Sequence, residues 1–191
     1  DHQFDAAALK KLAEMGVHMA PVELPKYPFD SMLTILSAEA AAVFDELTRT
    51  GRDKLLVSQG PFAWPNTFRT ARFIPAVEYI QAMRARFLAM EAMNKAVAGF
   101  DVIVAPTGGE QLTVTNLTGH PALILPNGFR GADAPPAAKP AKSGVIDSNY
   151  GGPGTPVSLT FLAPLYGEAK LLAFARAYQD ATRFHLRHPQ L

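Results

Sequence analysis

The sequence predicts an α/β fold in which a mixed β-sheet has flanking helices. Three short runs rich in Val, Ile and Leu predict strands, and they lie at 101–106, 122–126 and 157–162. Longer stretches with apolar residues at helical spacing precede the first run and follow the third. Helix followed by buried strand is typical of layered α/β proteins, so these observations together define the fold class.

Composition limits the classes of function. The chain has 191 residues, 48% of them hydrophobic, with 18 basic against 17 acidic residues and a net charge of +1. A charge this close to zero gives no field that would attract nucleic acid or anionic lipid. The absence of cysteine excludes thiol chemistry, and the apolar runs are far shorter than the roughly 20 residues that span a bilayer. We therefore expect residues 1–191 to form a single partial domain that binds neither nucleic acid nor membrane.

The first half of the chain is predicted to be mostly helical. Asp5 is expected to cap a helix that Gly16 ends, and residues 17–25 are expected to form a short edge strand. A second helix is predicted from Asp30 to about Thr50, with Gly51 closing it, and residues 52–66 are predicted to be loop. A further helical stretch should begin at a cap, Asn66 or Thr67, and continue as an apolar stripe over 77–97. Pro75 either starts a new helix there or kinks a continuous one.

The second half alternates strands and connections. Six Gly and five Pro predict that residues 127–156 are a flexible connection between the second and third strands. The last helix is predicted from about Gly167 to His185.

The reactive side chains follow no catalytic pattern. None of the six serines lies in a Gly-x-Ser-x-Gly motif, and a triad assembled from distant residues has no support in the sequence, so we assign no catalytic residue. His185 and His188 have metal-ligand spacing but no acidic neighbour, so no metal and no cofactor is expected. His120 most simply forms hydrogen bonds in a turn before a strand, and contact with a ligand is the alternative.

Three segments follow one another in the second half of the chain. They are Asp101-Val-Ile-Val-Ala-Pro-Thr107, then Thr115-Asn-Leu-Thr-Gly-His-Pro-Ala-Leu-Ile-Leu-Pro-Asn-Gly-Phe129, and Gly154-Thr-Pro-Val157 followed by Gly167-Glu-Ala-Lys-Leu-Leu172. In this order they resemble the C-terminal half of the amidase signature family. The helix before the first segment also carries Tyr79, Ala82 and Arg86 at the family's Tyr-x-x-Ala-x-x-x-Arg positions. Departures occur too, since the family's Pro-Val-Gly-Leu-Gln strand is Pro-Val-Ser-Leu-Thr at 156–160.

The resemblance implies hydrolysis of carboxamide C–N bonds by a Ser nucleophile, a second Ser in a cis peptide and a Lys that relays the proton. A lysine can act as a base only when its surroundings keep it neutral near pH 7. These residues belong to the family's N-terminal half, and no two serines are adjacent in this chain. We therefore expect a C-terminal fragment of an amidase that is catalytically incomplete alone. Because residue 1 is Asp, we also expect the chain to begin within a longer product.

Four residues are predicted to lie nearest a substrate cleft: Thr107 and Gly108, at the end of the first strand, and Asn116 and Thr118, just ahead of the second. Open α/β sheets bind ligands at the carboxyl ends of their strands. A purely structural role in turns is the alternative for each of them.

The expected partners are a small-molecule amide substrate and, through exposed sheet surface, a second copy of the chain. With no export signal in the residues seen, the cytoplasm is the expected compartment. The competing hypothesis is a stand-alone, non-catalytic binding or interaction domain that kept the fold. A third hypothesis, an unrelated α/β hydrolase, predicts turnover by these residues alone.

Overall fold

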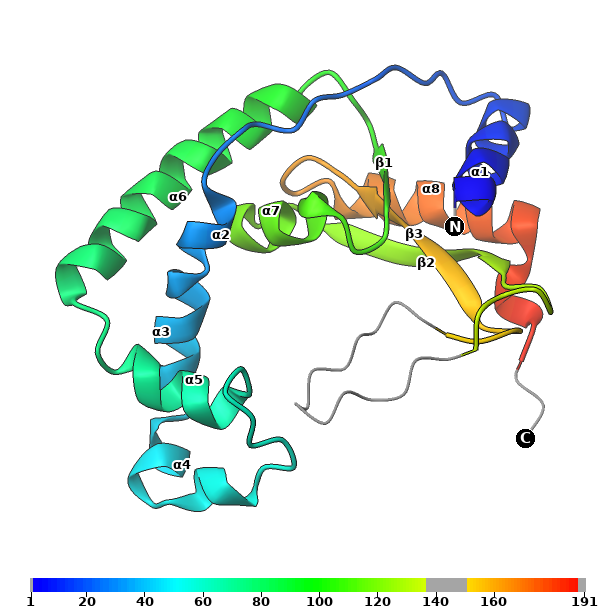
Figure 1. Ribbon diagram of the computed structural model, residues 1–191. Coiled ribbons are helices and arrows are strands. Elements are labelled where there is room, and N and C mark those ends of the chain that lie inside the picture. The colour runs from blue at the N-terminus through cyan, green and yellow to red at the C-terminus, as the bar shows by residue number, and fades with distance from the viewer. Residues whose placement is uncertain (1, 137–150, 189–191) are drawn as a thin grey trace. The chain divides into compact units, whose positions relative to one another are not determined.

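The computed structural model describes residues 2–136 and 151–188 (Figure 1). Within them the chain divides into two compact units, unit 1 with residues 2–26, 89–136 and 151–188, and unit 2 with residues 27–88. Helix α6, Ala76–Val97, runs from unit 2 into unit 1. The predicted α/β class with flanking helices is confirmed. That the whole chain folds as a single domain stays a prediction.

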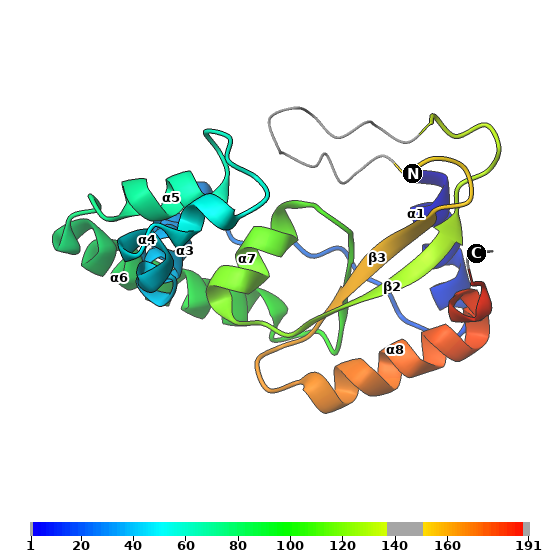
Figure 2. The ribbon, with the colours of Figure 1, turned by 90° about the horizontal axis from the view of Figure 1, so that it is seen from below.

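Unit 1 contains a three-stranded sheet. Its strands are β1 (Ile103–Pro106), β2 (Ala122–Phe129) and β3 (Pro156–Leu162), in the order β1-β3-β2, and both described pairings are antiparallel (Figure 2). All three predicted strands are present. Strand β2 continues to Phe129 through a register shift after Pro126, so the predicted 127–156 connection begins and ends with strand residues. Part of that connection, 137–150, lies outside the described residues.

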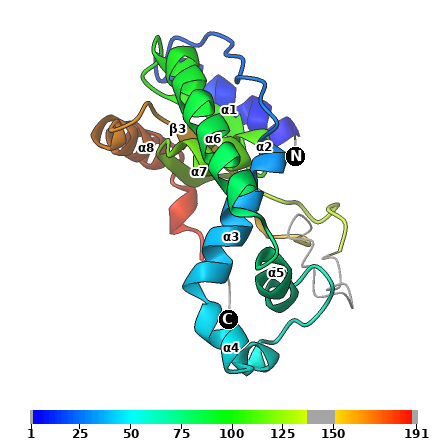
Figure 3. The same cartoon turned by 90° about the vertical axis from the view of Figure 1, so that its left-hand side faces the viewer.

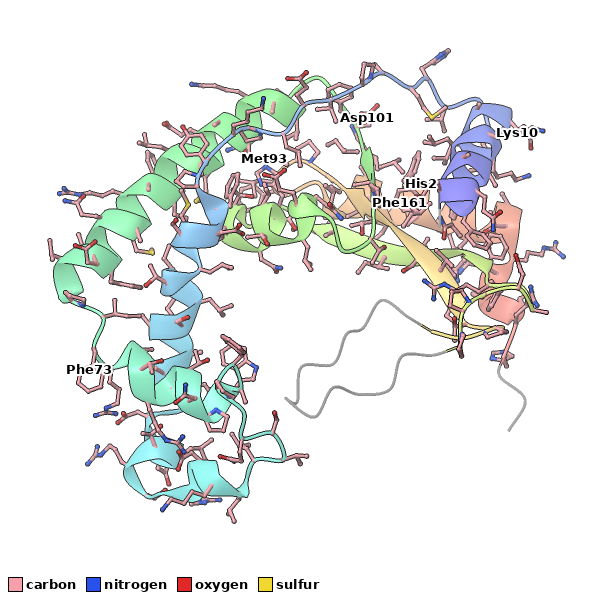
Figure 4. All side chains as sticks on the ribbon, viewed as in Figure 1. His2, Lys10, Phe73, Met93, Asp101 and Phe161 are labelled. Carbon is pink, nitrogen blue, oxygen red and sulfur yellow. The ribbon has the colours of Figure 1, made fainter. Side chains whose placement is uncertain are left out.

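Two helices complete the core of unit 1, α1 (His2–Glu14) and α8 (Glu168–Thr182). Phe161 of β3 is fully buried between their apolar faces (Figure 4), and its ring makes edge-to-face contacts with Phe174 and Tyr178 at centroid distances of 5.1 and 5.2 Å. Such aromatic pairs stabilise a core by more than their buried area alone. The periodicity of the two helices predicted part of this core: Ala8, Leu12, Leu171, Ala175 and Tyr178 are buried, whereas Leu9 and Leu172 are exposed.

The ends of these helices follow the prediction in part. Gly16 has a φ of 84°, the left-handed conformation that ends a helix at low steric cost. Asp5 does not cap α1, because it lies inside the helix and accepts a hydrogen bond from Asn127 Nδ2 at 3.1 Å. The predicted last helix is split, since Arg183 takes a φ of 55° and Phe184–Leu186 form a separate 3-10 turn.

Unit 2 is helical, but the helix predicted over 30–50 is three shorter ones. They are α2 (Phe29–Met32), α3 (Thr34–Val43) and α4 (Asp45–Arg49), followed by a 3-10 turn at Arg52–Leu55. Phe44 leaves helical geometry between α3 and α4, and its ring lies 5.3 Å from that of Phe68 on helix α5 (Trp64–Ala71). Phe68 is buried while Phe44 stays 46% exposed, so the ring contact joins α3 and α5 at the edge of the unit 2 core.

Helix α5 (Trp64–Ala71) begins earlier than predicted, and neither Asn66 nor Thr67 caps it. Its N-cap is Ala63, and Pro65 occupies the first turn, where a missing N–H leaves no hydrogen bond broken. Asn66 Nδ2 instead donates to the carbonyl of Pro61 at 2.8 Å. Of the two roles considered for Pro75, the structure shows the first, because Pro75 lies just before the separate helix α6.

Two further predictions from periodicity differ from the structure. The strand predicted over 17–25 is absent, since residues 17–28 have no regular structure; three prolines at 21, 25 and 28 remove the donors that a ladder needs. The apolar stripe on α6 is buried only in its second half, at Met93 and Val97. Val77 and Ile80 in the first half, and Phe87 at the middle of the helix, are exposed.

Candidate functional site

A glycine-containing turn at the carboxyl end of β1 forms the centre of the candidate site. Gly108 has a φ of 80°, which a side chain would strain, and a Cβ on Gly109 would collide with the side-chain oxygen of Gln111. Gln111 is buried, and its amide nitrogen donates to the Pro106 carbonyl. This hydrogen bond closes the turn, and residues 107–109 of the turn are exposed to solvent.

Thr107 is the exposed hydroxyl of this turn. Its Oγ1 lies 3.3 Å from the Oγ1 of Thr160, which the β1–β3 register places opposite Ala105. Two hydroxyls, either of which can donate or accept, therefore lie together beside the turn. The sequence identified Thr107 but missed Thr160 and Gln111, because no local pattern shows which strand residues lie opposite one another.

Helix α7 (Glu110–Thr118) follows the turn directly and was not predicted. Thr, Val and Asn make up five of its nine residues, and all three have low helix propensity. Tertiary burial overrides that preference, since Val114, Thr115 and Leu117 are buried. The backbone N–H groups of the first turn of a helix have no intrahelical acceptor, so the exposed turn also presents donors.

Asn116 and Thr118 lie on α7 rather than in a loop before β2. Asn116 is exposed and donates from Nδ2 to the Leu112 carbonyl at 2.8 Å. Thr118 has no exposed surface, and its hydroxyl donates to the Val114 carbonyl at 2.8 Å. The four predicted residues therefore form two groups, Thr107 with Gly108 at the turn, and Asn116 with Thr118 toward the other end of α7. Their role in substrate binding stays a prediction.

Beyond α7, His120 connects the turn before β2 to α6. Its Nδ1 lies 2.8 Å from Thr118 Oγ1, and its Nε2 lies 3.1 Å from Asn94 Oδ1. Burial lowers the pKa of His120 below its usual value, because the charged ring would lose hydration. His120 therefore forms hydrogen bonds in the turn before β2, as predicted from the sequence. The sequence did not predict Asn94 as one of its partners.

Two structural features are absent from the described part of the chain. No three of its His, Asp and Glu side chains come together as a metal site would require. No helix among the described residues has both the length and the hydropathy for crossing a bilayer.

Comparisons with known proteins fit this architecture. No family model matches the chain. An amidase of Pseudomonas putida is 26% identical over 219 residues, which cover 97% of this chain and 40% of that protein. A glutamyl-tRNA(Gln) amidotransferase subunit of Nostoc punctiforme is 30% identical over 133 residues, covering 59% of this chain and 23% of that protein.

Two solved structures are similar in fold to this chain. The crystal structure of an amidase matches with a TM-score of 0.66 at 18% identity, covering 94% of this chain and 41% of that one. A bacterial aryl acylamidase of the amidase signature family matches with a TM-score of 0.63 at 18% identity, covering 94% and 40%.

These matches, with the sheet and helices that carry them, make this an α/β chain related to the amidase signature family. The chain spans about 40% of the length of the Pseudomonas amidase, which is consistent with the predicted C-terminal portion.

Proposed function

We propose that the chain is part of a hydrolase that cleaves carboxamide C–N bonds, and that it supplies fold and substrate pocket rather than the reacting groups. The observation that carries the proposal is the similarity to an amidase along 97% of this chain. The resemblance implies a Gly-Gly-Ser-Ser-Gly-Gly type segment that carries the reacting serines, and these 191 residues contain no such segment. The chain alone is therefore catalytically incomplete under this proposal.

The turn after β1 is the part of the pocket that suits an amide. A carboxamide has one carbonyl acceptor and, when unsubstituted, two N–H donors. The exposed Thr107 hydroxyl can accept from the amide N–H, and the first-turn N–H groups of α7 can donate to its carbonyl. Gly108 allows close approach of the substrate, and Asn116 lies exposed further along α7. Thr118 contributes by tying α7 to His120.

The remaining partners belong to the same proposal. A net charge of +1 supports the expectation that this chain binds no nucleic acid. The outer edges of β1 and β2 have no strand partner among the described residues, which supports self-association through the sheet. A cytoplasmic location is proposed as well, and fractionation of the source cells tests it.

The first experiment assays the purified 191-residue chain against an unsubstituted aliphatic carboxamide and an aryl anilide, measuring ammonia and aniline release. We expect no turnover above buffer. Turnover by the chain alone would contradict the proposal and favour an unrelated hydrolase with its own triad.

The second experiment reads the coding DNA upstream of the Asp1 codon in the source organism. We expect an in-frame Lys and a Gly-Ser-Ser-Gly stretch. A start codon directly before Asp1 would instead favour the non-catalytic binding domain.

In the longer enzyme, Thr107→Val removes one neutral hydrogen bond to the substrate, which corresponds to an increase in KM of about five- to tenfold. The matched control is Thr182→Val on α8, whose hydroxyl bonds only the carbonyls of its own helix. An unchanged KM for Thr107→Val would show that the Thr107 hydroxyl does not bind the substrate, and would contradict a role of the turn in the substrate pocket.

A further inference from the structure

Helix α6 exposes large apolar side chains that the fold of this chain does not use. Phe87 is 60% exposed and Leu88 is 53% exposed, and Ile80 and Val77 are exposed nearby on the same helix. Figure 3 shows the course of α6 as a ribbon. An open hollow of about 500 Å³ adjoins Phe87 and is lined by residues of α6 alone, among them Ile80 and Met83. Contiguous exposed apolar surface of this kind marks an interaction site.

The charges beside this apolar pair are arranged symmetrically. Arg84, Phe87, Leu88 and Glu91 follow the i, i+3, i+4, i+7 spacing, so they share one face of a continuous helix. Arg84 lies as many residues before the midpoint of the Phe87–Leu88 pair as Glu91 lies after it. Both charged residues are exposed, and neither has an ion-pair partner within residues 2–136 and 151–188.

We propose that two copies of this chain associate through antiparallel α6 helices, with the two-fold axis passing beside the Phe87–Leu88 pair. In that register Phe87 faces Phe87 of the second copy, and Leu88 faces Leu88. Arg84 meets Glu91 of the second copy, and Glu91 meets its Arg84. A two-fold interface brings the same patch of both copies together, so the patch must be complementary to itself. An apolar centre with one charge of each sign at equal distances on either side meets that requirement.

A parallel arrangement is disfavoured by the same residues. It would place Arg84 beside Arg84 and Glu91 beside Glu91, and like charges in contact repel. The hollow next to Phe87 is open at the same face of α6, so a second helix can approach the Phe87 ring there. One helix pair buries less surface than a standard stable interface, so we expect a weak dimer.

Charge reversal tests the register. Sedimentation equilibrium of the 191-residue chain is measured from 5 to 300 μM for the wild type, Arg84→Glu, Glu91→Arg and the double variant. Each single reversal places like charges opposite each other, so we expect Kd to rise at least about tenfold. The double variant restores opposite charges and should return to within about threefold of the wild-type Kd.

Two control variants carry the same changes of charge elsewhere. Lys54→Glu lies on the 3-10 turn of unit 2, and Glu78→Arg lies on α6 about 130° around the helix from the proposed face. Both residues are exposed and should leave Kd unchanged. Far-UV circular dichroism of every variant checks that the fold is retained.

Cross-linking tests the geometry separately, because the chain contains no native cysteine. In the proposed dimer, position 88 of one copy lies close to position 88 of the second copy. A short bismaleimide should therefore cross-link two copies of the Leu88→Cys variant. It should not cross-link two copies of the Val77→Cys variant, because the helical rise separates the two copies of that position by about 30 Å. A parallel pair would cross-link both variants.

Three results would overturn the proposal. The first is a wild-type chain that stays monomeric at 300 μM. This result is expected if the α6 face is instead covered by further polypeptide of a longer protein. The second is a dimer whose Kd ignores the reversals at positions 84 and 91, which would assign association to the sheet edges or to another apolar surface. The third is a double variant that binds no better than either single variant.

Discussion

The hydroxyl of Tyr178 is buried in the core of unit 1 without a hydrogen-bond partner among the described residues. Burial raises the pKa of Tyr178 to about 12, because the phenolate would lose hydration there. The ring nevertheless packs edge-to-face on Phe161 at 5.2 Å. The residue therefore stabilises the core through its ring and destabilises it through its oxygen.

Tyr178→Phe should stabilise the protein. The change keeps the aromatic contact and removes an unsatisfied polar group, so the free energy of unfolding should rise by about 1 kcal/mol. Urea denaturation of the variant and the wild type measures it. Phe174→Leu, which loses a ring contact with Phe161, is the control and should destabilise. A loss of stability in Tyr178→Phe would show that the hydroxyl has a bound partner.

His120 makes stability depend on pH. Its folded-state pKa is lowered from about 6.5, so the unfolded chain binds a proton more readily than the folded one. The stabilising contribution is therefore complete above pH 6.5 and is lost as the pH falls toward the folded-state pKa. We expect the midpoint of urea unfolding to decrease as the pH is lowered from 7.5 to 5.5.

The control for this pH dependence is His120→Gln, which keeps hydrogen-bonding capacity and cannot titrate. The urea midpoint of His120→Gln should change less than that of the wild type between pH 7.5 and 5.5. Equal slopes for the variant and the wild type would assign the pH dependence to other groups.

At the scale of elements, an ion pair fixes the segment between α4 and α5. Asp53 is only 3% exposed and pairs with Arg69 of α5. Gln59 adds hydrogen bonds from Nε2 to the carbonyls of Asp53 and Leu56, at 3.0 and 2.7 Å. Asp53 lies 16 residues before Arg69 along the chain, so no local sequence pattern reveals this pair.

Arg69→Met should destabilise unit 2 by about 2–3 kcal/mol, because it leaves the Asp53 carboxylate buried without a counter-charge. Arg72→Met is the matched control. Its partner Asp45 keeps 35% of its side chain exposed, so the expected loss is below about 1 kcal/mol. Urea unfolding followed by Trp64 fluorescence measures both. Equal effects for the two variants would contradict the role of burial.

At the scale of the whole molecule, the two compact units raise the question of cooperativity. The only tryptophan, Trp64, belongs to unit 2 and reports on it alone, while hydrogen exchange in β2 and β3 reports on unit 1. A single domain unfolds in one transition, so we expect both probes to change at the same urea concentration. Separate midpoints would show that the units fold independently and would contradict the single-domain prediction.

The order of elements was largely accessible from the sequence. The three strands occur at the Val, Ile and Leu runs, and the left-handed Gly16 and Gly51 lie where the predicted helices end. These features depend on residues within one turn or a few positions of each other, so local propensity encodes them. The resemblance to the amidase signature family was also visible in short segments of consecutive residues.

Only the tertiary structure decided how the candidate site is assembled. Thr160 lies 53 residues from Thr107 in sequence, and only the strand register brings their hydroxyls to 3.3 Å. Helix α7 forms against its own propensity because Val114 and Leu117 are buried. Phe44 ends α3 to pack on a distant ring. The sequence by itself determined the local periods and turns, whereas the site, the breaks in the helices and the exposed face of α6 depend on which distant residues pack together.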